Sequence, residues 1–474
     1  MHTQLVVIGA GPGGYAAAFL AADEGLKVTI VESAPHMGGT CLLRGCIPSK
    51  ALLHVARVIG EVDELRSDWG VAYEAPSIDI DVIRRRKEKI IRTLTGGLQQ
   101  LAKRRNVSII RARGRFQDSQ TVLLDGDHDS IPESRCLTFD HAILATGSVP
   151  TMPAMFDVGS DRIMDSTGAL ELKQVPSSLL VIGGGYIGLE MGSVYASLGS
   201  QVSIVEMTDG LLPGVDRDLV KPLHQRLSTL FDNRIFLNSK VGSLGDRGNS
   251  IEVAFEGPGK FGVEQYESVL VAVGRRPNSG DLGIENTRVE LDGNGFVKSD
   301  QQQRTTDEKI FAIGDVTGEP MLAHKASHEG KIAVEAILGQ PAEFNPLAIP
   351  AVVFTDPEIA WAGLTQDQAK LQNRDVAVSI YPWAASGRGH AIGRIEGLTK
   401  WLIDPSSNRV IGCGIVGPGA GELIAEAVLA IEMGCDVRDV TSSIHPHPTL
   451  SETLMNAGEV HLGTATEIYK PRRG

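Results

Sequence analysis

Short apolar runs and helical apolar patterns alternate along this chain. The runs LVVI from Leu5 and LLVI from Leu179 are each followed by a glycine-rich turn, a helical pattern and a second apolar run. Continuous apolar runs of this length predict strands buried on both faces, as in parallel sheets. Strands that alternate with helices in this way predict an α/β fold.

The pattern is an internal repeat. LVVIGAGPGGYAAAFLAADEGLKVTIVE, from Leu5, recurs as LLVIGGGYIGLEMGSVYASLGSQVSIVE, from Leu179, and one constant offset relates four positions in the two copies. These positions are Gly9, Gly11, Gly14 and Glu32 in the first copy and Gly183, Gly185, Gly188 and Glu206 in the second.

Each copy has the features of a dinucleotide-binding unit. The first glycine permits a tight turn, the second lets the backbone approach a pyrophosphate, and the third lets the helix pack on the strand. The glutamate that ends the second strand can accept hydrogen bonds from both hydroxyls of an adenosine ribose, whereas it would repel a 2′-phosphate. The sequence therefore predicts two bound dinucleotides, neither with a 2′-phosphate.

Three more apolar runs that end in glycine, HAILATGS, SVLVAVGRRPN and KIFAIGDV, complete the predicted sheets. In the last of them Asp315 follows a strand and a glycine, where a carboxylate can reach a sugar-like hydroxyl. Beyond Pro346 the chain has strands and one long helical pattern but no nucleotide signature, which predicts an α/β interface domain. The predicted division is 1–150 for the first part of an FAD-binding domain, 151–276 for an NAD-binding domain, 277–345 for a central segment completing the FAD site, and 346–474 for the interface domain.

Charge and hydropathy exclude two classes of partner. With 45 basic and 58 acidic residues the net charge is -13, which would repel a nucleic-acid backbone. No apolar run is long enough to span a bilayer, and the first strand begins too early to leave room for a signal peptide. We therefore expect a cytoplasmic protein that binds neither nucleic acid nor membrane, and no metal site is indicated.

Two basic runs, RRRKEK from Arg84 to Lys89 and KRR from Lys103 to Arg105, flank an apolar helical pattern. The simplest interpretation is a solvated surface helix. Docking of an acidic partner protein is the alternative.

The stretch GGTCLLRGCIPSK, from Gly38 to Lys50, holds two cysteines five residues apart. An ideal helix separates such Cα atoms by roughly 8 to 9 Å, more than the approximately 7 Å that a disulfide tolerates, so a bridge would need a distorted turn. A strained disulfide in a reducing compartment is the kind that cycles between its two redox states. Two buried free thiols are the alternative.

The stretch HPHPTLSE supplies a candidate base. His447 is held between two prolines, and Glu452 is close enough to accept a hydrogen bond from one ring nitrogen and leave the other free to take a thiol proton. The neighbouring His445 is interpreted as structural.

With these residues in view, the chain resembles the flavin-dependent pyridine nucleotide disulfide oxidoreductases over essentially its whole length. AHKA and Glu206 point to the lipoamide branch, and the lack of a further cysteine pair near the C-terminus argues against a mercuric reductase. The motifs, in the order of the family, are GAGPGGY, GGTCLLRGCIPSK, ATGS, GGGYIGLE, VGRRPN, AIGDV, MLAHKA and HPHPTLSE.

The resemblance implies that FAD lies on the first glycine turn and NAD on the second. For His324 a purely structural role remains open, because its side chain can point away from the flavin. The implied FAD contacts beyond the first glycine turn and Glu32 are Gly39, Thr40, Lys50, Gly114, Thr146, Gly147, Ser148, Asp315, Met321, Leu322, Ala323 and His324. The implied NAD contacts beyond the second glycine turn are Tyr186, Glu190, Glu206, Val241 and Gly274.

The resemblance also implies the catalytic roles. Cys41 would exchange with a dithiol substrate and Cys46 would be the partner nearer the flavin. Lys50 would stabilise a thiolate and the reduced flavin, with Glu190 as its ion-pair partner. His447 and Glu452 would be the base and its orienting acid, and in the family this motif belongs to the partner subunit, which implies a homodimer.

The implied activity is NAD-dependent oxidation of protein-bound dihydrolipoyl groups. The implied partners are the lipoyl domains and core acyltransferase of 2-oxo acid dehydrogenase complexes. Two alternatives remain: an NADPH-dependent disulfide reductase of the same superfamily, and a mainly structural flavoprotein subunit that binds the complex core. Tyr186 departs from the lipoamide branch, which usually has a small aliphatic residue there, and is either a gate over the flavin or a packing residue.

Overall fold

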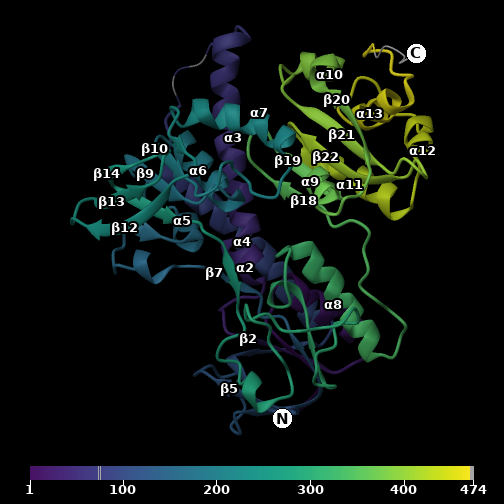
Figure 1. Ribbon diagram of the computed structural model, residues 1–474. Helices are drawn as coiled ribbons and strands as arrows, with labels where there is room; N and C mark the ends of the chain where they lie inside the picture. The colour runs from purple at the N-terminus through teal and green to yellow at the C-terminus, as the bar shows by residue number, and fades with distance from the viewer. Residues whose placement is uncertain (73, 75, 470–474) are drawn as a thin grey trace.

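The computed structural model describes residues 1–72, 74 and 76–469, and the chain forms three lobes (Figure 1). The lobe at the bottom of Figure 1 contains the N-terminus, the lobe at the upper left contains the second repeat, and the lobe at the upper right contains the C-terminal part. The long helix α3 (Cys46–Asp68) extends from the centre of the molecule to the top of that view. Among the residues described, no helix has the length and apolar character to cross a membrane.

The first lobe is built on a seven-stranded sheet. Its order is β3-β2-β1-β6-β5-β4, and β17 pairs in parallel with the end of β6. Successive residues of β1 are buried on opposite faces: Leu5 and Val7 in one core, Val6 and Ile8 in another. The strands are β1 (His2–Ile8), β2 (Val28–Glu32), β3 (Ser108–Arg111), β4 (Arg113–Asp118), β5 (Thr121–Asp125), β6 (Cys136–Leu144) and β17 (Ile310–Ala312).

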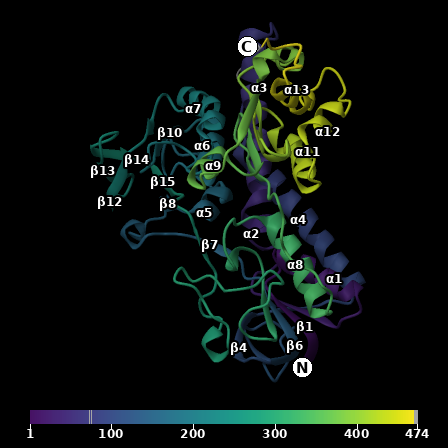
Figure 2. The ribbon, with the colours of Figure 1, turned by 45° about the vertical axis from the view of Figure 1, so that its right-hand side comes forward.

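Helices cover this sheet and connect it to the rest of the chain. Figure 2 shows α1 and α8 packed together beside the sheet. The first glycine turn leads into α1, whose N-cap is Gly11. The basic helix α4 packs against α2 and α3. The helices are α1 (Pro12–Asp23), α2 (Gly39–Arg44), α4 (Ile80–Arg104) and α8 (Ala323–Ile337), with the short 3₁₀ turns η2 (Ile284–Asn286) and η3 (Gly314–Val316).

The second lobe repeats the parallel arrangement. Its five-stranded sheet has the order β11-β10-β9-β15-β8, and a three-stranded antiparallel sheet, β12-β13-β14, lies in the same unit. The elements are β8 (Ile163–Met164), β9 (Ser178–Ile182), β10 (Gln201–Val205), β11 (Ile235–Phe236), β12 (Lys240–Asp246), β13 (Ile251–Glu256), β14 (Gly262–Tyr266), β15 (Ser268–Val271), η1 (Ala154–Phe156), α5 (Ser166–Glu171), α6 (Tyr186–Ser197) and α7 (Arg217–Leu230). The short strands β7 (Ser148–Pro150) and β16 (Arg275–Pro277) pair where the chain passes between the two lobes.

The third lobe is a five-stranded antiparallel sheet, β18-β19-β22-β21-β20, with helices against it. The long helix predicted from Gly421 to Met433 is present as α11. The elements are β18 (Ala351–Val353), β19 (Ile359–Gly363), β20 (Ala377–Pro382), β21 (Leu398–Ile403), β22 (Val410–Val416), α9 (Gln366–Leu371), η4 (Trp383–Ala385), α10 (Gly387–Ala391), α11 (Ala420–Glu432), α12 (Val437–Ser442) and α13 (Glu452–Leu462). The predicted α/β class is therefore confirmed.

A buried ion-pair cluster joins the second and third lobes. Lys400 on β21 has no exposed side-chain area, and its Nζ lies 2.7 Å from carboxylate oxygens of both Asp216 and Asp218 at the start of α7. Asp216 also accepts hydrogen bonds from the backbone N–H groups of Gln366 and Asp367. These contacts hold the pKa of Asp216 below its usual value despite burial, because the Lys400 charge and the N–H donors favour the carboxylate.

Candidate functional site

The two glycine turns have the same packing. A Cβ on Gly14 would lie 2.0 Å from the carbonyl oxygen of Gly9, and a Cβ on Gly188 would lie 2.3 Å from that of Gly183. A side chain at either position would push the helix away from its strand. In contrast, a Cβ on Gly185 would meet nothing within 4 Å, so the backbone is open toward a ligand there.

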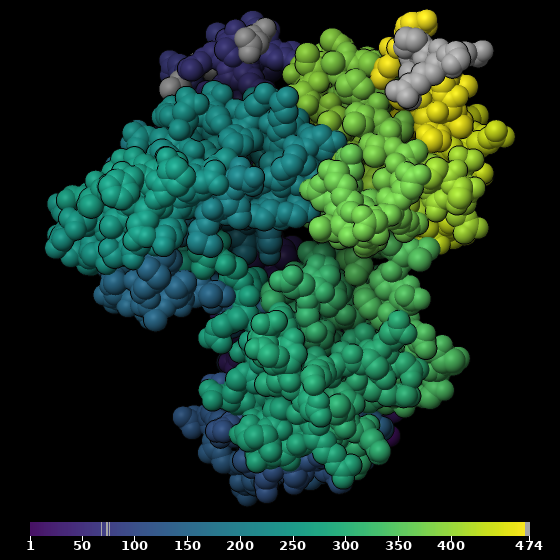
Figure 3. All heavy atoms as spheres, viewed as in Figure 1, coloured from purple at the N-terminus to yellow at the C-terminus, as the bar shows by residue number. Residues whose placement is uncertain are grey.

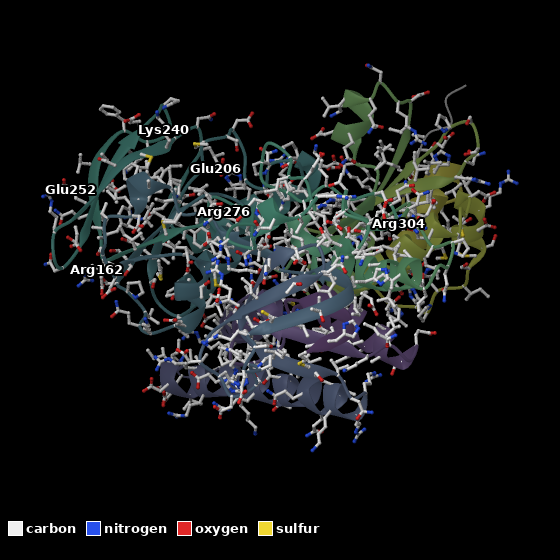
Figure 4. All side chains as sticks on the ribbon, turned by 90° about the horizontal axis from the view of Figure 1, so that it is seen from below. Arg162, Glu206, Lys240, Glu252, Arg276 and Arg304 are labelled. Carbon is white, nitrogen blue, oxygen red and sulfur yellow. The ribbon has the colours of Figure 1, made fainter. Side chains whose placement is uncertain are left out.

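The two strand-end glutamates are also held alike. Glu32 accepts from the backbone N–H groups of Ala10, at 2.7 Å, and Ala34, at 2.8 Å. Glu206 accepts from those of Gly184, at 2.7 Å, and Thr208, at 2.8 Å. The hydroxyls of Ser33 and Thr208 also donate to Glu32 and Glu206, at 3.5 and 2.9 Å. An ionised carboxylate has about four acceptor positions, so each glutamate retains about one for a ribose hydroxyl. Glu206 lies in the same lobe as Lys240 and Arg276, away from Arg304 (Figure 4).

A cavity of about 460 Å³ begins at the first glycine turn. This volume is within the usual range for cofactor sites. Residues of the first lobe surround it, together with residues of α5, the start of α6 and Arg275 of β16. In the space-filling view the surface is hollowed near the centre, between the lobes (Figure 3). The predicted residues that line it are Gly9, Gly11, Glu32, Gly39, Thr40, Cys41, Cys46, Lys50, Gly114, Thr146, Gly147, Ser148, Tyr186, Glu190, Asp315, Met321 and Ala323.

Cys41 and Cys46 are in contact within this cavity. The helix breaks between them at Gly45, which has φ -149° and ψ -115° and separates α2 from α3, so the expected distorted turn is present. Both cysteines are free thiols in the structure, which is the reduced state of a pair that the sequence predicts to cycle with its disulfide.

The two thiols share a proton unequally. The Cys41 thiol hydrogen-bonds to Cys46, which raises the pKa of Cys41 and lowers the pKa of Cys46 to about 7. Burial raises both values, and the Lys50 charge lowers both. Cys46 is therefore the thiolate of the pair, ionised above about pH 7.

Lys50 lies one turn beyond Cys46 on α3. Its Nζ is 2.8 Å from Oε2 of Glu190 on α6, and it lies 4.5 Å from the ring centre of Phe354. Glu190 is buried and also accepts from the backbone N–H of Phe354, at 3.0 Å. The Lys50 charge beside the thiols is therefore held in place by Glu190 of α6 and by Phe354, which follows β18.

A second chain of contacts crosses the cavity. Ser148 Oγ donates to Asp315 at 2.5 Å and accepts from Nε of Arg275 at 2.8 Å. Thr146 Oγ1 is buried beside them and has no hydrogen-bond partner among the described residues. An unpaired buried hydroxyl is costly unless a ligand pairs with it, so the cavity fits a polar cofactor such as FAD.

Some predicted cofactor residues do not line this cavity. Leu322 precedes α8 and lies outside the lining, and His324 Nε2 is 2.8 Å from the carbonyl oxygen of Pro350, so its side chain points away. In the second lobe the side chain of Val241 is buried in the core, which leaves its backbone alone to face a nucleotide. Gly274 has φ +122° and follows β15.

The His447–Glu452 dyad lies in the third lobe. His447 Nδ1 is 3.1 Å from Oε1 of Glu452, whose other oxygen accepts from the backbone N–H of Thr449. His447 is 77% exposed, and neither member of the dyad lines the cavity with the cysteines. The neighbouring His445 is bonded to Glu426 at 2.7 Å and its side chain is almost buried, as expected of a structural histidine.

Sequence reasoning missed two residues of the site. Arg275 belongs to the quoted VGRRPN stretch, and its position after a glycine-ended strand was the available signal. Phe354 contacts Lys50 and Glu190 from a segment more than 160 residues away from Glu190, and no sequence pattern points to it.

The sequence pattern of the pyridine nucleotide-disulphide oxidoreductase family matches residues 3–330, and that of its dimerisation domain matches residues 349–457. The chain belongs to the pyridine nucleotide-disulphide oxidoreductase family, as predicted.

Curated relatives and solved structures agree with this assignment. The chain is 47% identical to a dihydrolipoyl dehydrogenase of Vibrio cholerae, over 99% of this chain and 97% of the relative, and 41% identical to one of Bacillus subtilis, over 99% and 98%. Among solved structures it resembles LpdA from Mycobacterium tuberculosis, with a TM-score of 0.88, 26% identity and coverage of 96% and 99%. It also resembles the HOCl-induced flavoprotein disulfide reductase RclA of Escherichia coli in its Cu(II) complex, with a TM-score of 0.84, 26% identity and coverage of 97% and 99%.

Proposed function

We propose that this protein oxidises protein-bound dihydrolipoyl groups to lipoyl groups and reduces NAD, with FAD as the bound cofactor. The observation that carries the proposal is the Cys41–Cys46 pair in the cavity of the first glycine turn, beside the Lys50–Glu190 ion pair. The full-length similarity to curated dihydrolipoyl dehydrogenases supports the choice of substrate.

The first glycine turn, Glu32, Thr146, Ser148 and Asp315 would hold FAD, and the second turn with Glu206 would hold NAD. FAD supplies a two-electron acceptor between the thiols and NAD. We also propose that the domain boundaries lie after residues 150, 276 and 345.

Each thiol has a separate task. A thiolate of the substrate attacks Cys41 of the oxidised pair, forms a mixed disulfide, and releases Cys46 as a thiolate. The second thiolate of the substrate then attacks the first substrate sulfur, which is bound to Cys41 in the mixed disulfide. This step closes the lipoyl disulfide and releases Cys41 as a thiolate. Lys50 stabilises the Cys46 thiolate, in agreement with its lowered pKa.

The base comes from the second subunit. The protein is a homodimer through its dimerisation domain, and His447 is exposed on that domain and absent from the cavity of its own chain. Nearby apolar side chains are also exposed, including Leu429, Met433 and Ile444, the last at 98%. We therefore assign the substrate proton to His447 of the partner subunit, whose Nδ1 is oriented by the partner's Glu452.

We place the enzyme in the cytoplasm, in a 2-oxo acid dehydrogenase complex, with lipoyl domains and the core acyltransferase as its partners. An absorption spectrum recorded while dihydrolipoamide is added, followed by NAD, tests flavin, disulfide and substrate together. Reduction of the flavin by dihydrolipoamide and its reoxidation by NAD are expected. Reduction by NADPH alone would favour the disulfide-reductase alternative, and no reduction by either would favour a structural subunit.

NAD is expected to be preferred over NADP because Glu206 pairs with a ribose hydroxyl and repels a 2′-phosphate. The ratio of kcat/KM for NAD to kcat/KM for NADP should correspond to a free-energy difference of about 1 to 3 kcal/mol. Glu206→Gln, which keeps the size of the side chain, should narrow the ratio of the two kcat/KM values. The matched change Glu32→Gln in the first turn should leave that ratio as it is, and equal kcat/KM for NAD and NADP in the parent enzyme would contradict this role of Glu206.

Tyr186 begins α6, lines the cavity and is 43% exposed. A ring in this position would shield reduced FAD from oxygen and move aside when nicotinamide binds. Tyr186→Val should therefore raise oxygen-dependent NADH oxidation and change NAD affinity, with the dithiol half-reaction almost unchanged. Stopped-flow traces of the two half-reactions measure this, with Tyr186→Phe as the control that keeps the ring; equal oxidase rates and NAD affinities in Tyr186→Val and parent would make Tyr186 a packing residue.

A further inference from the structure

Apart from Arg92, which is exposed and pairs with Glu88 at 3.7 Å, the cations of α4 and of its C-cap residue Arg105 fall into two groups. Arg84 and Lys87 donate to backbone carbonyl oxygens at the end of α5, including those of Leu172 and Leu170, and Arg105 pairs with Asp23. These three have structural roles. The other group is exposed to solvent: Arg85, Arg86, Lys89, Lys103 and Arg104.

The positive charges of the exposed group are not neutralised by ion pairs within the described residues. None of these five forms an ion pair with any residue that the structure describes, and the two acids on the helix, Asp81 and Glu88, are each close to another arginine. Arg85 and Lys89 are one turn apart, and Arg86 and Lys89 are three residues apart, so like charges are neighbours. Repulsion between these like charges destabilises the helix unless an anionic partner binds there. The cluster is positive although the chain as a whole has a net charge of -13.

The position of this helix relates it to the reaction. It packs against α2, which carries Cys41, and against α3, which begins at Cys46. Arg44, at the end of α2, adds another exposed cation and lines the cavity itself. The helix with the exposed cations thus packs on the two helices that carry the thiols.

We propose that the exposed cationic face of α4, with Arg44, docks an acidic protein domain that carries the dihydrolipoyl group. This inference rests on the proposed function, and its occupant follows from charge complementarity: this face attracts a domain with a negative surface, whereas the chain as a whole has a net charge of -13. The attraction concentrates the carrier next to Cys41 and raises the association rate.

The test compares two forms of the same substrate on the holoenzyme dimer. One is free dihydrolipoamide, which has no domain to dock, and the other is a reduced, isolated lipoyl domain of net negative charge. The variant is Arg85→Glu with Arg86→Glu and Lys89→Glu, because glutamate is a good helix former. The control is Lys27→Glu with Lys221→Glu and Lys331→Glu, three exposed lysines elsewhere with the same total charge change.

For the α4 variant, kcat/KM with the domain should fall roughly tenfold or more at low salt, within the range of electrostatic steering, and the difference should shrink as salt is added. Its kcat/KM with free dihydrolipoamide should stay within about twofold of the parent value. Flavin content and thermal unfolding confirm that each variant is folded, and Arg85→Gln with Arg86→Gln and Lys89→Gln should give an intermediate loss if the reversal does not fold.

Three results would overturn the proposal. They are an unchanged kcat/KM with the domain, an equal loss in the control variant, and tighter α4-dependent binding of a DNA duplex or a phosphatidylcholine–phosphatidylglycerol vesicle than of the lipoyl domain at the same salt. Failure of the parent enzyme to oxidise free dihydrolipoamide would instead contradict the proposed function.

Discussion

Cys41→Ser is expected to lower dihydrolipoamide-dependent NAD reduction by roughly 10⁴-fold or more, as for removal of other catalytic nucleophiles. The remaining Cys46 thiol should ionise and perturb the flavin spectrum, giving a long-wavelength absorption band. Cys46→Ser should be equally inactive but should lack this band, because Cys46 is the thiol predicted to lie nearer the flavin.

The pH dependence of that band checks the thiolate assignment. In the intact pair the hydrogen bond from Cys41 and the Lys50 charge lower the pKa of Cys46 to about 7 despite burial. In Cys41→Ser the thiol donor is gone and the Lys50 charge remains, so the band should be present above the Cys46 pKa of that variant and be lost as the pH falls through it. Lys50→Gln in the Cys41→Ser background should move the midpoint of the band to higher pH, because the lysine charge favours the thiolate. An identical spectrum in the two cysteine variants would remove the distinction between their roles.

His447→Gln is expected to slow dihydrolipoamide oxidation by roughly 10² to 10⁴-fold, the range for loss of a positioned base. Reduction of a small artificial acceptor by NADH should hardly change, because that half-reaction involves no thiol proton. His445→Gln is the matched control: its side chain is bonded to Glu426 and is nearly buried, so it should leave the rate of the chemical step close to that of the parent.

Mixed dimers test whether the site is shared between subunits. A dimer of one His447→Gln chain and one Cys41→Ser chain contains one site with both native residues if His447 serves the partner's thiols. Such a heterodimer should recover about half the activity of the parent dimer. If His447 acted on its own chain, neither site would be complete and the mixture would remain inactive.

The local parts of the site could be predicted from sequence. The repeat identified both glycine turns and both glutamates, because strand, turn and helix are set by neighbouring residues, and the spacing of Cys41 and Cys46 anticipated the break at Gly45. The fold class and family were likewise correct.

Contacts between lobes could not be predicted. The carboxylate of Glu190 is held by the backbone of Phe354, and Ser148 by Arg275, and both contacts depend on how separately folded segments meet. The direction of the His324 side chain was left open for the same reason, since it is decided by the Pro350 carbonyl on a distant segment. The redox state of the cysteine pair is a property of conditions that a sequence does not specify.

The Lys400 cluster limits how this sequence can diverge. A change of Lys400 alone would leave Asp216 and Asp218 beside a buried gap, and a change of Asp216 alone would leave part of a buried ammonium unpaired, at a cost of about 3 to 5 kcal/mol for a fully broken pair. Replacement of all the members together by apolar residues of similar volume would avoid the cost of an unpaired charge, although the N–H groups of Gln366 and Asp367 would then need another acceptor. Descendants of this gene should therefore retain the cluster intact or lose it in concert, and a chimaera that joins the second lobe of one homologue to the third lobe of another should fold only when both parents share it.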